Sequence, residues 1–137
     1  MFGFGVGKHK RLLIRAFSEC FQPLKDELGN VPLDMQTSPQ IAASILGVCR
    51  TYGASHNLKP ININVIADAV FEELFRRDSV AVQTRADGWE NEQNEEFIKA
   101  YQQATSKIDS QDSETIDLSW LTESLKANFK PATGLML

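Results

Sequence analysis

The side chains best suited to catalysis or metal binding in this chain are two histidines and two cysteines. His9 and His56 lack a cysteine or a second histidine at the short spacings of metal sites, so we expect them at the surface or at helix ends. Cys20 and Cys49 fall on apolar helical stripes, where a thiolate is disfavoured. We therefore predict two reduced core thiols, and pairing of either cysteine with His56 as a nucleophile is the disfavoured alternative.

Adjacent carboxylates also fail to form an obvious acid–base pair. Glu72 and Glu73, and likewise Glu95 and Glu96, are neighbours in predicted helices. Consecutive helical residues point about 100° apart, so the two members of each pair do not converge on one substrate. We interpret them as parts of solvated helix faces.

Two segments resemble ligand-binding loops, and each lacks residues that its motif requires. The glycine-rich Gly3–Lys8 has Phe2 where a phosphate-binding loop needs its first glycine, and His9 where it needs Ser or Thr. The acidic segment Asp109–Trp120 has Glu114 at the glycine position of a calcium-binding EF-hand loop and tryptophan at its glutamate position. We therefore expect no cofactor and no metal site, and weak cation binding by the acids of this segment is the alternative.

Charge is unevenly distributed along the chain. The formal net charge of −4 disfavours nucleic acid as a partner, because phosphate neutralisation supplies most of that binding energy. Residues 1–25 hold five basic residues against one acidic residue, whereas residues 78–117 hold ten acidic residues against three basic ones. A helix-turn-helix is also disfavoured, since its recognition helix would carry Asp68, Glu72 and Glu73. The pattern indicates a basic and an acidic surface on one molecule.

Apolar residues recur at helical spacing in five segments that are joined by short connections. The predicted helices cover residues 9–28, 38–56, 62–77, 87–108 and 117–129. With no convincing strand pair, they predict an all-α fold: a single compact helical bundle over residues 9–130. The remaining segments are predicted to be a flexible Gly/Phe arm at 1–8, an acidic linker at 109–116 and a C-terminal tail at 131–137.

Several helix ends carry capping signals. Ser38-Pro39 predicts the start of the second helix. Asn62 or Asn64 is expected to cap the third helix, and Asp87 with Glu90 resembles a capping box for the fourth.

Two other regions are harder to assign. Pro23 predicts a kink or a new helical piece in the first helix, with Leu28 on its buried stripe and Gly29 as its C-terminal cap. Residues 79–85 alternate only weakly, so we interpret them as irregular structure or a helix extension.

Two features are candidate binding surfaces. The acidic face of the fourth predicted helix carries Glu92, Glu95 and Glu96, and Trp120 lies off the apolar stripe of its own helix, as interface aromatics often do. The N-terminal segment places apolar anchors before a cationic cluster, which suits an anionic membrane surface or ligand. Its residues are Phe2, Phe4, Lys8, Lys10, Arg11 and Arg15. The alternatives are that the arm folds its phenylalanines onto the core and that a neighbouring loop or helix buries Trp120.

The sequence therefore favours a small, non-catalytic protein that binds another protein as an adaptor or regulatory module. Peripheral binding to an anionic membrane surface or anionic ligand through the N-terminal segment is the alternative. Opposite charges on one chain also allow a homodimer. No apolar run approaches the ~18 residues of a membrane span, and the basic cluster follows the first apolar residues instead of preceding them as in a secretory signal. We therefore expect a cytoplasmic location.

Overall fold

The computed structural model describes residues 4–112 and 115–133, and within these ranges it contains helices and no strands. Its α-helices are α1 (Phe4–Phe21), α2 (Pro39–Ser55), α3 (Pro60–Phe75), α4 (Ser79–Asn91), α5 (Glu95–Asp109) and α6 (Ser119–Asn128). Short 3₁₀ helices occur at η1 (Gln22–Leu24), η2 (Leu33–Thr37) and η3 (Arg76–Asp78). The predicted all-α bundle with a single hydrophobic core is confirmed.

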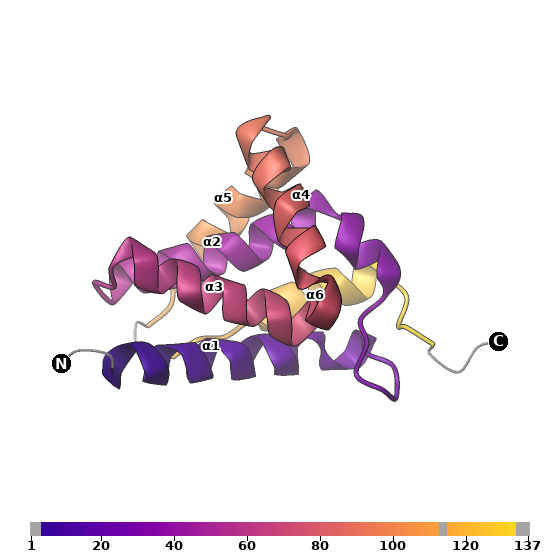
Figure 1. Cartoon of the computed structure of the whole chain (residues 1–137), viewed down its shortest axis with the longest axis horizontal. Helices are drawn as coiled ribbons and strands as arrows, with labels where there is room; N and C mark the ends of the chain where they lie inside the picture. The colour runs from indigo at the N-terminus through magenta and orange to yellow at the C-terminus, as the bar shows by residue number, and fades with distance from the viewer. Residues whose placement is uncertain (1–3, 113–114, 134–137) are drawn as a thin grey trace.

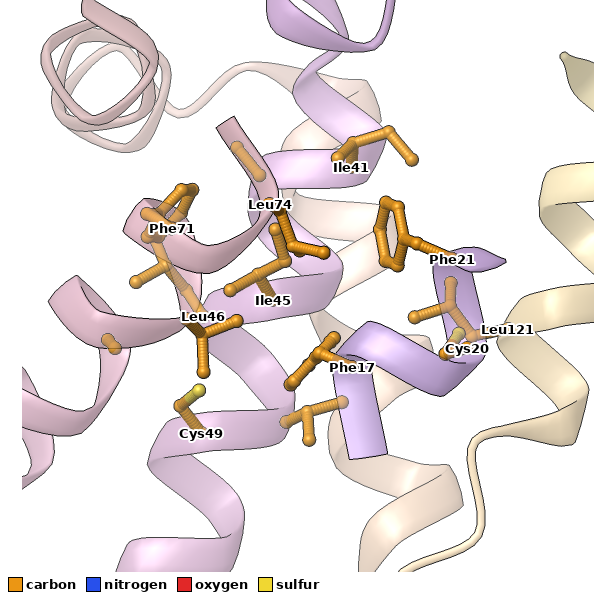
Figure 2. Close-up of a cluster of buried hydrophobic side chains, with 14 of the residues drawn as sticks. Phe17, Cys20, Phe21, Ile41, Ile45, Leu46, Cys49, Phe71, Leu74 and Leu121 are labelled. Atoms are coloured by element: carbon orange, nitrogen blue, oxygen red, sulfur yellow. The ribbon is translucent and has the colours of Figure 1, made fainter. Parts of the chain in front are cut away.

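Helix α2 is the central element of the bundle. Every residue from Ile41 to Cys49 is buried, because α3, α4 and α5 all pack against this helix. Helix α1 lies along α3, and α6 packs on α1 (Figure 1). Figure 2 shows side chains of α1, α2, α3 and α6 meeting in one apolar cluster. The predicted start of α2 is confirmed, since the backbone N–H of Ile41 donates to Ser38 Oγ at 3.2 Å.

Helices α2 and α5 approach each other closely through small residues. A Cβ atom at Gly47 would lie 2.9 Å from the Cβ of Ala104 and 3.1 Å from the carbonyl oxygen of Tyr101. One turn further along, the hydroxyls of Thr51 and Thr105 are hydrogen-bonded at 3.2 Å. Glycine at position 47 thus lets the two helix backbones approach to a distance that any side chain would prevent.

The first helix begins earlier than predicted. Helix α1 starts at Phe4, so residues 4–8 are helical and are not the arm that we expected there, while residues 1–3 lie outside the described residues. Each glycine in a helix costs about 1 kcal/mol relative to alanine. Residues 4–8 extend a helix that has already nucleated, so their helical conformation does not also incur the cost of nucleation.

The same helix also ends earlier than predicted. Helix α1 stops at Phe21, and Pro23 lies in the 3₁₀ turn η1, so the regular helix is interrupted at this proline as predicted, but no helical piece continues to Leu28. The next residues form a turn in which Asp26 Oδ1 accepts the backbone N–H groups of Leu28 and Asn30, both at 2.9 Å. Leu28 is therefore 64% exposed, so its predicted place on the buried stripe is wrong. Gly29, at φ 84°, belongs to this turn and does not cap α1.

The predicted fourth helix is two helices, with a break at residues 92–94. The segment at 79–85 is helical because Ser79, Val82 and Ala86 share one buried face, a spacing hidden by the weak alternation. Asp87 therefore lies inside α4, and the predicted capping box is wrong. Asn94 caps α5 instead, accepting the backbone N–H of Phe97 at 3.0 Å.

Two other helix starts differ from prediction. Helix α3 begins at Pro60, after Lys59, which makes no side-chain capping bond, so neither Asn62 nor Asn64 is its cap. Proline suits this first position because its missing N–H is not needed there. Helix α6 begins at Ser119, close to the predicted boundary, and Leu121 and Leu125 are buried as expected.

Candidate binding surfaces

The acidic residues predicted to contact a partner gather at the corner between α4 and α5. Glu92 follows the end of α4, and Glu95 and Glu96 form the first turn of α5. All three are exposed, and the corner projects from the bundle on the side away from α1 (Figure 1). Carboxylates in a first helical turn interact favourably with the helix dipole, so Glu95 and Glu96 also stabilise the start of α5. We call Glu92, Glu95 and Glu96 the acidic corner.

The base of this corner is fixed by one ion pair. Arg50 of α2 donates to both carboxylate oxygens of Glu90, at 2.5 and 3.1 Å, and its guanidinium lies 5.7 Å from the ring centre of Tyr101 in α5. A two-point arginine–carboxylate contact fixes orientation as well as distance. Arg50 thereby connects three helices, and it holds in place the elements that present the acidic corner.

The basic residues of the N-terminal segment form a second surface. Lys8, Arg11 and Arg15 lie on one stripe of α1 and line a hollow of about 720 Å³ between α1 and the chain leading to α6. The apolar residues of this hollow include Leu12 and Ile116. Arg15 is 3.6 Å from Glu19 in an exposed pair, the one ion pair that α1 forms among the described residues. We call this hollow the basic groove.

The other predicted site residues lie apart from these two surfaces. Lys10 is half-buried and does not line the basic groove. Phe2 and the side chain of Phe4 lie outside the part of the chain that the structure describes. Trp120 is half-buried on α6, which packs on α1 and η1, so it does not share the acidic corner. Its indole N–H is buried, and no described group accepts it.

Both histidines of the chain belong to a cluster that the sequence did not predict. His9 of α1 meets Tyr52 of α2, with 2.6 Å between the imidazole Nδ1 and the tyrosine oxygen. His56 stacks on Tyr52 with ring centres 4.0 Å apart, and the two histidine rings are 4.8 Å apart. Burial lowers the pKa of His9, and the charges of His56 and Lys8 lower it further. The i, i+4 spacing of Tyr52 and His56 was visible in the sequence, but their meeting with His9 depends on tertiary packing.

The cysteines are inert at neutral pH. Both are free and buried, as predicted. Burial raises the pKa of Cys20 to about 11 and that of Cys49 to about 12, so both remain thiols. Across residues 4–112 and 115–133, no group of three or more His, Cys, Asp or Glu side chains is placed to hold a metal ion.

Comparison with known proteins leaves the surfaces themselves as the basis for a functional proposal. No protein family, curated protein or solved structure matches this chain. Of the helices that the structure describes, none combines the length and apolar character needed to cross a membrane.

Proposed function

We propose that this protein is a small cytoplasmic binding module that recognises a basic surface of another protein through its acidic corner. The observation that carries the proposal is the projection of Glu92, Glu95 and Glu96 from the bundle on a base held by Arg50 and Glu90. A projecting charged surface on a fixed base suits electrostatic recognition, which governs association rate and specificity. Binding is favoured over covalent catalysis because the cysteines, the strongest nucleophiles of the chain, are protonated and buried.

The test uses the protein as bait in lysate of its native host at low and high salt. Wild type is compared with the triple variant Glu92→Gln, Glu95→Gln, Glu96→Gln. The matched control, Glu27→Gln, Glu72→Gln, Asp109→Asn, removes three exposed charges that lie outside the acidic corner. We expect a stoichiometric, salt-sensitive protein partner that wild type and control retain and that the triple variant binds about tenfold more weakly. Equal retention by the triple variant, or no stoichiometric partner, would refute the proposal.

The basic groove supports a second function, peripheral binding to an anionic membrane surface. The specific observation is that Lys8, Arg11 and Arg15 line one side of a hollow that is also lined by apolar side chains. Cations beside apolar groups fit a layer of anionic headgroups, to which each basic residue contributes about 1 kcal/mol. A free anionic ligand is the other source of the same chemistry.

Flotation with vesicles of phosphatidylcholine and phosphatidylglycerol tests this second function. The variant Lys8→Gln, Arg11→Gln, Arg15→Gln should lose recovery with the vesicles. The charge-matched control Lys59→Gln, Lys99→Gln, Lys107→Gln should keep it. Recovery that is the same for both variants, or absent for wild type, argues against a membrane role. Sedimentation velocity of wild type at low and high salt shows whether the two opposite charges pair two copies instead.

A further inference from the structure

A second hollow, of about 740 Å³, lies apart from the acidic corner and the basic groove. It lies between the loop after η1, the end of α3 and the last described residues. Its apolar wall includes Val31, Leu74 and Phe75, all of which are buried in the core. The chain at Ala132 closes one side, because its backbone N–H donates to the carbonyl of Leu24 at 2.9 Å. The hollow is thus formed by segments that the core holds in place.

Two consecutive arginines, Arg76 and Arg77, line this hollow. Arg76 has φ 55° and ψ −125°, a left-handed conformation that ordinarily favours glycine, and this turns the chain sharply at the end of α3. Its guanidinium lies against Gly29, where a Cβ atom would clash with Nη2, and Nη1 is 3.5 Å from Asn30 Oδ1. Arg77 is exposed and forms no ion pair within the described residues. Most of the donors of both guanidinium groups are therefore available to a ligand.

The acids beside these arginines are already engaged by other donors. Asp26 accepts two backbone N–H groups of its own turn, and these bonds, together with the charge of Arg76, lower the pKa of its carboxyl group. Asp78 accepts the side-chain amide of Gln36 at 3.0 Å. Neither acid forms an ion pair with Arg76 or Arg77 among the described residues. The hollow therefore combines carboxylates that already accept hydrogen bonds, guanidinium groups with available donors, and an apolar wall.

We propose that this hollow binds a small organic anion, a carboxylate or phosphate monoester whose apolar body rests on the wall beside Phe75. Arginine suits this role because its planar fork donates two parallel hydrogen bonds to either oxyanion. The glycine-like backbone of Arg76 fits the same interpretation, since such conformations concentrate at ligand sites. The acidic corner and the basic groove take no part in this site.

Nuclear magnetic resonance titration of the ¹⁵N-labelled full chain tests the proposal. The probes are benzoate and phenyl phosphate. Inorganic phosphate is the control that lacks the apolar body of the expected ligand, and benzyl alcohol is the control that lacks its negative charge. We expect saturable shifts at Asn30, Arg76 and Arg77 with benzoate or phenyl phosphate, at a Kd of about 1 mM or tighter. Which of the two binds more tightly distinguishes a carboxylate site from a phosphate site.

Two matched variants test whether Arg77 contributes to binding of the anion. Arg77→Gln should weaken binding about tenfold, as expected for losing charge-assisted hydrogen bonds. Lys99→Gln removes one exposed positive charge from α5 and should leave the Kd unchanged. Saturable binding of benzyl alcohol at the same residues, an unchanged Kd in Arg77→Gln, or no saturable shift with either organic anion would each overturn the proposal.

Discussion

Helix α2 is held in two different ways along its length. Its middle packs on α5 through Gly47 and Ala104, with backbones so close that no side chain fits between them. Its C-terminal end is held by rings, since Tyr52 and His56 meet His9 of α1. The first contact depends on shape, and the second depends on polar groups that include the titratable imidazole of His9.

The two contacts of α2 are therefore expected to respond differently to pH and salt. Close packing of small residues is insensitive to pH and salt, but a single methyl group can disrupt it. The ring cluster tolerates changes of shape better, because both histidine side chains are only half-buried, but protonation alters it. The predictions below test this contrast, beginning with the largest effect.

The largest loss of stability is expected from Gly47→Ala. The added methyl group would lie 2.9 Å from the Cβ of Ala104 and 3.1 Å from a backbone oxygen, and neither atom can move without moving α5. Overpacking of this kind costs about 1–3 kcal/mol and exceeds the gain in helix propensity. Urea unfolding of wild type and variant measures the free energy difference.

Gly88→Ala is the matched control for this prediction. Gly88 lies within α4, and a Cβ atom there would meet nothing within 4 Å. The same substitution should therefore stabilise the protein by about 0.5–1 kcal/mol. If both variants shift the urea midpoint in the same direction, the close α2–α5 contact does not limit what position 47 accepts.

An intermediate effect is expected from breaking the Arg50–Glu90 pair. Both side chains are about a third exposed, so solvent screens the pair, and we expect Arg50→Met or Glu90→Gln to cost about 1–2 kcal/mol. The double variant should cost less than the sum of the two single variants, because each single change already removes the contact. Chemical unfolding of all four proteins measures the coupling energy, and strict additivity would contradict a direct interaction.

The helical spacing of apolar residues predicted most of the fold. It failed where contacts with other helices determine the residues at which a helix begins and ends. The helical stripe of Ile41, Ile45 and Cys49 predicted α2 correctly, because a central helix buries nearly all its apolar residues. The start of α4 stays open in the sequence, as irregular structure or a helix extension, because residues 79–85 bury only Ser79 and Val82, too few to show the period. The capping signal at Asp87 was equally local, and it is outweighed by the burial of the preceding residue, Ala86, in a helix that packs on α3 and α2.

The candidate surfaces were predictable only to the extent that they are local in sequence. Glu92, Glu95 and Glu96 are neighbours along the chain, so their common location at one corner followed from proximity. The histidine cluster joins positions 9, 52 and 56, and the hollow at Arg76 joins three distant segments. Helical periodicity states which face of a helix is apolar, but not which helix will cover it, so these two groupings required the structure.

The smallest predicted effect is a pH dependence of stability that arises from His9. Its pKa lies below the usual 6.5 in the folded protein, through burial and the charges of His56 and Lys8, so folding favours the neutral ring. The unfolded chain then binds more protons as pH falls through about 6.5, and stability falls with it until the folded ring is protonated as well. Tyr52 faces the same ring as a neutral hydrogen-bond partner.

Thermal unfolding at about pH 8 and about pH 5.5, on either side of that unfolded pKa, measures this effect. Carboxylates also titrate toward the lower pH, so the comparison is between wild type and His9→Asn, which keeps a polar partner for Tyr52. Wild type should lose more thermal stability than the variant on acidification, because only wild type must protonate a ring beside His56 and Lys8. Equal losses in the two proteins would show that the ring cluster tolerates protonation, and both contacts of α2 would then be insensitive to pH.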